Sequence, residues 1–195
     1  PPRAGAPAPA ATLAGGRPRV TGTALAQLSW DILWENALPA IDAVKDHLVT
    51  PAVEKVVEAN TLLSGLGFES GGLAAAHAIH NGLTAAPQTH GLTHGQKVNI
   101  GSVTQLVLEG APTEEIEEFV RFTTRVGLPN TLTEIGLTAD DVHDLTRVAE
   151  SATAEGETIH AMPFPVRVPE LVDALRSIEG FSRRVRAEAG LPEPV

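Results

Sequence analysis

The sequence of 195 residues contains no cysteine. This absence excludes disulfides, thiolate-ligated zinc, iron–sulfur clusters and thiol catalysis. It is compatible with the reduced cytosol, and we expect a cytoplasmic protein. Basic residues are also few, because 14 lysines and arginines stand against 24 aspartates and glutamates, for a formal charge of −10. Such a chain has no net positive field with which to release counterions, so nucleic acid is not expected as a partner.

Long hydrophobic runs are missing as well. No apolar run reaches the ~18 residues that a membrane span needs, and the N-terminus lacks the pattern of a signal peptide. We therefore expect no membrane partner. Apolar residues still make up 43% of the chain and charged residues 19%, which favours a buried core over general disorder. One group of basic residues is interpreted as the solvated face of a helix end: Arg176, Arg183, Arg184 and Arg186.

The chain divides into a short proline-rich segment and a long helical region. Residues 1–18 hold five of the 15 prolines and few large apolar side chains, which predicts a tail or linker. From Thr21 onward apolar residues recur at spacings of three and four, and no segment alternates apolar and polar residues for more than about four positions. The pattern predicts one α-helical domain over residues 19–195, built as an all-α multi-helix bundle.

Several helix boundaries can be predicted from local signals. Pro39 is expected to end the first helix or to begin the next. Thr50 and Pro51 predict a helix start with a capping hydroxyl. The segment 64–72, SGLGFESGG, is predicted to be too rich in glycine to be helical throughout. A short helix that carries His77 and His80 should follow, then a loop over 84–93 and another helix that starts at His94.

Four of the seven histidines fall within 18 residues, at His77, His80, His90 and His94. His77 and His80 are three residues apart, so both project from a similar side of one helix. A helix, a loop and a helix start can bring His77 and His94 together. Two neutral imidazoles form a partial site for Zn²⁺ or Fe²⁺, which normally needs a third ligand and an open position. Spacing alone leaves open a metal site or histidines that are hydrogen-bonded or solvated.

Other chemistries are disfavoured by their context. Gly65 and Gly67 follow a helix rather than a strand, so a dinucleotide loop is not supported and a tight turn is the simpler interpretation. Ser64 and Ser70 lack the nucleophile elbow that a hydrolase triad would use. A run of acidic residues early in a helix is interpreted as a solvated face that complements the helix dipole: Glu114, Glu115, Glu117 and Glu118.

The segment 58–108 resembles bacterial glycerol dehydrogenases, within the metal-dependent (iron-containing) alcohol dehydrogenase family. GFESGGLAAAHAIHNG and LTHG carry the resemblance, and AEGETIH and LAGG also fit. It extends from about Arg3 to the last helix. The resemblance implies the helical, metal-binding C-terminal domain of a two-domain enzyme with the dehydroquinate synthase-like fold.

The resemblance also implies roles for particular residues. His77 and His94 match the family's two histidine metal ligands, and Phe68 matches an aromatic residue that lines the substrate pocket. His80 matches the second histidine of the helix, with a catalytic proton-relay or supporting role, or alternatively a structural one. A further motif receives no role beyond local hydrogen bonding: Glu155, Glu157 and His160.

The implied activity is the NAD-dependent oxidation of glycerol, or a similar small 1,2-diol, to dihydroxyacetone with Zn²⁺ or Fe²⁺. The family's third ligand, an aspartate, and its N-terminal NAD-binding domain have no counterpart in this sequence. We therefore expect a fragment, a truncated gene product or half of a split enzyme, inactive alone. The complete enzyme would be a homo-oligomer. The alternatives are a non-catalytic assembly or interaction domain, and a related dehydrogenase or synthase with another substrate.

Overall fold

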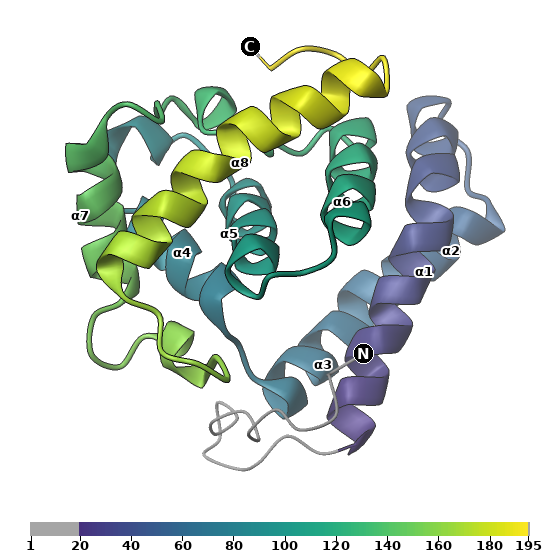
Figure 1. Ribbon diagram of the computed structural model, residues 1–195. Helices are drawn as coiled ribbons and strands as arrows, with labels where there is room; N and C mark the ends of the chain where they lie inside the picture. The colour runs from purple at the N-terminus through teal and green to yellow at the C-terminus, as the bar shows by residue number, and fades with distance from the viewer. Residues whose placement is uncertain (1–19, 195) are drawn as a thin grey trace. The chain divides into compact units, whose positions relative to one another are not determined.

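The computed structural model describes residues 20–194, which form helices joined by loops and contain no strand (Figure 1). The predicted all-α fold is confirmed, whereas the tail predicted for residues 1–18 lies outside the described residues. Contacts divide the chain into two compact units, Pro1–Leu73 and Ala74–Val195, and each is described by itself. Among the described helices, none has both the length and the hydropathy of a membrane span.

The first unit is a helical hairpin in which one long helix packs against two short ones. Helix α1 (Val20–Lys45) contacts α2 (Pro51–Glu58) and α3 (Ser64–Gly71), and a π-helical turn, η1 (Ala59–Leu63), joins the two short helices. The prediction that Pro39 ends a helix is wrong, because α1 continues through it. A proline inside a helix costs about 3 kcal/mol, and we attribute its tolerance to the packing of α1 along both partners.

Two further boundaries in this unit were predicted with mixed success. Helix α2 does begin at Pro51, but the hydroxyl of Thr50 makes no capping hydrogen bond. The glycine-rich segment is helical as α3, so the prediction of a break there is wrong. Gly67 is buried against α1, where an added Cβ would lie 3.4 Å from the backbone of Ala26. Gly67 therefore lies within a helix that packs on α1 rather than in the predicted tight turn.

The second unit is built around α5 (His94–Leu108), which lies among α4 (Ala75–Leu83), α6 (Thr113–Arg125) and α8 (Val168–Glu188) (Figure 1). Helix α7 (Val142–Ala152) packs on α4 and α8. Short 3₁₀ turns interrupt the loops: η2 (Pro87–Thr89), η3 (Thr133–Ile135) and η4 (Thr158–Ala161). The helices predicted around His77 and from His94 onward are confirmed. The fully buried apolar side chains of α4, α5, α7 and α8 form the core of the second unit: Ile79, Leu83, Ile100, Val103, Leu145, Leu171, Leu175 and Ile178.

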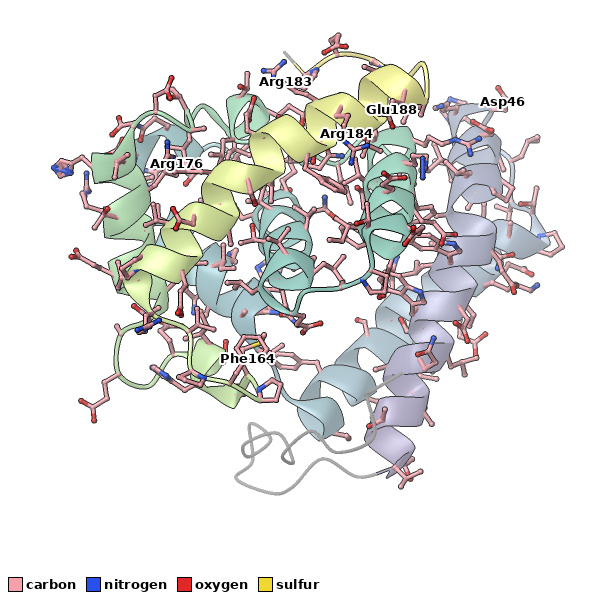
Figure 2. All side chains as sticks on the ribbon, viewed as in Figure 1. Asp46, Phe164, Arg176, Arg183, Arg184 and Glu188 are labelled. Carbon is pink, nitrogen blue, oxygen red and sulfur yellow. The ribbon has the colours of Figure 1, made fainter. Side chains whose placement is uncertain are left out.

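The arginines of α8 do not form a free basic patch (Figure 2). Arg184 pairs with Glu117 and Glu188, and the guanidinium of Arg176 donates to the Ala139 carbonyl. Arg186 was interpreted as solvated, but it is only 4% exposed and pairs with Glu134 at 2.8 Å. Arg186 lies on the face of α8 that packs against the loop before η3, where it also contacts Asn130. Helical periodicity alone did not predict this burial.

Candidate metal centre

The two helices that carry the histidines are held at their N-termini by side chains. The backbone N–H of Ala76, in the first turn of α4, donates to Gln105 Oε1 of α5 at 2.9 Å. The Thr158 hydroxyl donates to the Ala74 carbonyl at 2.8 Å. Helix α5 begins with a capping box between Thr93 and Gln96. These contacts fix where each histidine leaves its helix.

Helices α4 and α5 approach each other so closely that one position of α5 admits only glycine. A Cβ added to Gly101 would lie 2.2 Å from the Ala76 carbonyl oxygen and 2.8 Å from its carbonyl carbon. Real Cβ atoms do not reach such distances. Because Ala76 directly precedes His77, this backbone contact sets the distance from His77 to the start of α5.

The rings of His77 and His94 lie 5.6 Å apart between centroids, with planes inclined by 48°. Two imidazoles that bind one ion at the usual Zn–N distance of about 2 Å, at a tetrahedral angle, hold their centroids about 5 Å apart. The pair therefore fits two ligands of a single divalent cation. In the described part of the chain, no group of three or more histidine, aspartate or glutamate side chains is arranged to hold a metal ion.

A chain of hydrogen bonds leads from His94 to Glu157 and assigns the ring protons. Asn81 Nδ2 donates to Glu157 Oε2 at 3.0 Å, which fixes the orientation of the Asn81 amide. Its Oδ1 lies 2.9 Å from His80 Nδ1, and because an amide oxygen can only accept, His80 Nδ1 carries the proton and donates. His80 Nε2 then carries the lone pair of the neutral ring and accepts from His94 Nδ1 at 3.2 Å. Because His94 Nδ1 holds the proton, its Nε2 keeps the lone pair that a metal ligand needs.

Both α4 histidines favour the neutral form. Burial lowers the pKa of His77, and repulsion from His94 and His80 lowers it further. Burial also lowers the pKa of His80, against the hydrogen bond to Asn81, which acts to raise it. A neutral imidazole is the form that binds metal ions, so the surroundings of both rings are compatible with cation binding near neutral pH.

Acidification below pH 6.5 is expected to reduce the free energy of unfolding of the second unit. The folded pKa values of His77 and His80 lie below 6.5, so the unfolded chain binds more protons just below that pH. The contribution of these two histidines to the free energy of unfolding should be fully present above pH 6.5. It should decrease as the pH falls toward their pKa values in the folded chain. Urea unfolding at about pH 7.5 and about pH 5.5 measures this slope. His77→Gln should flatten it, and an unchanged slope in that variant would contradict the assignment.

The other predicted site residues are placed as follows. The His90 ring lies 3.0 Å from the Thr84 carbonyl oxygen. Phe68 belongs to α3 of the first unit and is 40% exposed, so its role at a substrate pocket stays a prediction. Glu155 is exposed, and the His160 ring lies 3.1 Å from the Ala154 carbonyl oxygen.

Sequence reasoning missed two contributors to the cluster. Asn81 directly follows His80, and its amide links that ring to Glu157. The AEGETIH motif contained Glu157 without indicating this partner, because 76 residues separate the two. Only the packing of η4 against α4 brings them together.

No family model matches the chain, but individual proteins do. It is 55% identical over 172 residues to a glycolaldehyde reductase of Halobacterium salinarum, matching 88% of this chain and 47% of that protein. It is 49% identical over 179 residues to a glycerol dehydrogenase of Escherichia coli, with 92% and 49% covered. The crystal structure of glycerol dehydrogenase from Schizosaccharomyces pombe superposes with a TM-score of 0.90 at 39% identity, covering 94% of this chain and 48% of that one.

The chain thus spans about half the length of the curated relatives that it matches. Its all-helical fold is consistent with the helical C-terminal domain of those proteins. The identities extend over almost the whole of the chain rather than over one motif. On this evidence the chain belongs to the glycerol dehydrogenase family.

Proposed function

We propose that this chain is the metal- and substrate-binding half of an NAD-dependent polyol dehydrogenase, which oxidises glycerol or a similar 1,2-diol to dihydroxyacetone. The observation that carries the proposal is the pair of His77 and His94, 5.6 Å apart between ring centroids. The names of the relatives, glycerol dehydrogenase and glycolaldehyde reductase, support a small hydroxylated substrate. The NAD site and a third metal ligand, an aspartate, would come from a part that this sequence does not contain.

His77 and His94 would hold Zn²⁺, with Fe²⁺ as the alternative because imidazole accepts both. Such an ion would supply Lewis-acid chemistry, which would lower the pKa of a substrate hydroxyl, and NAD would supply the hydride acceptor. We propose polyols rather than simple alcohols as the substrates on the strength of the resemblance. Phe68, in the first unit, is proposed to contact the substrate on the strength of the family resemblance alone.

The remaining residues of the cluster act on the ligands. His80 Nε2 accepts a hydrogen bond from the Nδ1–H of His94 and so holds that ring in the tautomer that presents Nε2. Asn81 and Glu157 hold His80 in turn. His80 is therefore proposed as a positioning residue, in place of the proton relay that the resemblance allowed.

Zinc binding by the purified chain tests this proposal. Isothermal titration should detect one Zn²⁺ per chain, bound weakly because the chain supplies two of the three ligands, and His94→Ala should weaken binding by more than about a further 100-fold, because it removes a ligand rather than a supporting partner. Asn81→Leu should weaken it by about 10–100-fold, since it frees His80 to rotate. His143→Ala provides the control, because His143 lies in α7, outside the cluster.

Two outcomes would contradict the proposal. One is equal zinc affinity in the wild type and in His94→Ala. The other concerns catalysis: the zinc-loaded chain with NAD and glycerol should produce no NADH, since it lacks the third ligand and the nucleotide site. NADH formation at an ordinary enzymatic rate would overturn the assignment of this chain as one half of the enzyme.

A second candidate function, a non-catalytic assembly module, is favoured by the apolar surface of the first unit. A groove of about 420 Å³ between α1 and α2 is lined almost entirely by apolar side chains, and Val44 and Val57 in its lining are more than half exposed. Contiguous apolar surface of this kind is typical of interfaces, as in the homo-oligomer proposed for the complete enzyme. A pure assembly module should retain no stoichiometric zinc, so the same titration separates the two functions.

A further inference from the structure

Helix α4 begins without a capping side chain of its own. Its N-cap residue is Ala74, which has no side-chain atom that can accept a hydrogen bond. The first N–H groups of a helix have no partner within it and need an acceptor from elsewhere. Helices α5 and α7 meet this need with adjacent residues, because Thr93 and Asp141 cap them. Helix α4 therefore depends on a more distant part of the chain.

Gln105 of α5 supplies an acceptor at this helix start. Its Oε1 accepts from the backbone N–H of Ala76 at 2.9 Å, and 29 residues separate the two in sequence. Ala76 is the second residue of α4, and its N–H is one of the two that an N-cap side chain normally binds. Gln105 Nε2 donates to Glu109 Oε1 at 2.7 Å, which leaves Oε1 to face Ala76. Both partners of the amide thus agree on its orientation.

The close approach of α4 and α5 makes this contact possible. Gly101 lies one turn before Gln105 on α5, so both positions lie on one side of that helix. Ala76 lies against both of them, because a Cβ on Gly101 would be 2.2 Å from its carbonyl oxygen and its N–H is bonded to Gln105. The missing side chain at Gly101 brings the backbone of α4 within reach of the glutamine.

We propose that Gln105 is the N-cap of α4, supplied from α5, and that it is a positioning residue for His77. His77 directly follows Ala76, and His94 is the first residue of the helix that carries Gln105. The hydrogen bond therefore joins the two helices that carry the two imidazoles, and its oxygen complements the positive end of the α4 dipole. That the imidazoles share an ion rests on the proposed function, whereas the cap does not.

Gln105→Met tests the positioning role, because methionine keeps the length of the side chain and removes its amide. Zinc affinity should fall by about tenfold or more, since His77 is no longer held relative to His94. The exchanged pair, Gln105→Glu with Glu109→Gln, keeps an acceptor oxygen at position 105 and a donor at position 109. It should restore most of the affinity. Isothermal titration of the three chains measures these differences.

Val120→Ala is the control for a general loss of stability. Val120 is fully buried in α6, so its truncation should lower the free energy of unfolding. Helix α6 packs on α5 and α8, and zinc affinity should change little. Full zinc affinity in a folded Gln105→Met variant would overturn the positioning role, as would an equal loss of affinity in Val120→Ala.

A second measurement needs no metal. Hydrogen exchange at the Ala76 amide, followed by NMR, should become about fivefold faster in Gln105→Met, in proportion to the loss of one cap. Exchange at Asp144, whose N–H is capped by Asp141, should not change. Unchanged exchange at Ala76 would overturn the cap itself. Absence of zinc binding in the wild type instead overturns the proposed function, and exchange at Ala76 then decides the cap alone.

Discussion

Gly101→Ala is expected to destabilise the second unit and to weaken zinc binding at its proposed metal centre at the same time. The new Cβ would lie 2.2 Å from the Ala76 carbonyl oxygen, so α4 must move away from α5. Overpacking of this kind costs about 1–3 kcal/mol, and more where backbone must shift. That movement also takes His77 away from His94, so zinc affinity should fall even in the fraction that stays folded. Urea unfolding and isothermal titration measure the two effects.

Gly180→Ala is the matched control for this substitution. Gly180 lies inside α8, where an added Cβ would meet no atom within 4 Å. Alanine there should stabilise the chain by about 0.5–1 kcal/mol, because it restricts the unfolded chain and suits a helix. If both variants gained stability, or if Gly101→Ala kept full zinc affinity, the close contact of α4 and α5 would not be what sets the histidine geometry.

Arg186→Ala is expected to cost about 3–5 kcal/mol of unfolding free energy, since it leaves a largely buried carboxylate without its partner. Arg186 Nη1 donates to Glu134 Oε1 at 2.8 Å, and its Nε donates to the Pro192 carbonyl at 2.7 Å. Glu134 also accepts from Thr131, so the arginine connects α8 to the loop before η3. Chemical denaturation of the wild type and the variant measures the loss.

Arg184→Ala provides the comparison on the same helix. The Arg184 side chain is 44% exposed in its pairs with Glu117 and Glu188, and exposed pairs are worth about 0–1 kcal/mol. The double variant Arg186→Met with Glu134→Leu should recover much of the loss, because no unpaired charge remains. Equal losses in Arg184→Ala and Arg186→Ala would refute the assignment of Arg186 as a buried structural cation.

Local periodicity predicted the helices well because their formation depends on residues three and four apart. The short helix with His77 and His80, the loop after it and the helix from His94 could all be predicted from such spacing. Predictions failed where packing overrode a local signal. Pro39 and the glycines of α3 normally break helices, yet contact between α1 and its neighbours keeps both segments helical.

The site itself could be predicted only in part. The residues that carry the family resemblance pointed to His77 and His94, and the structure brings those two rings together. Asn81 and Glu157 could not be paired from sequence, since their contact requires η4 to pack on α4. Gln105 gave no signal either, because its contact with Ala76 exists only where α5 packs on α4.

By itself, then, the sequence determined the helical class and the absence of thiol chemistry, since each follows from residue type and short-range spacing, whereas the two imidazoles proposed as metal ligands came from the family resemblance. Tertiary structure decided which histidine nitrogen keeps its lone pair, how closely α4 approaches α5, and which charges lie inside. Those properties depend on atoms that the chain brings together from distant positions. The hydrogen bonds of the histidine cluster, and the approach of the Ala76 carbonyl oxygen to within 2.2 Å of where a Cβ on Gly101 would lie, exist only once the helices are packed.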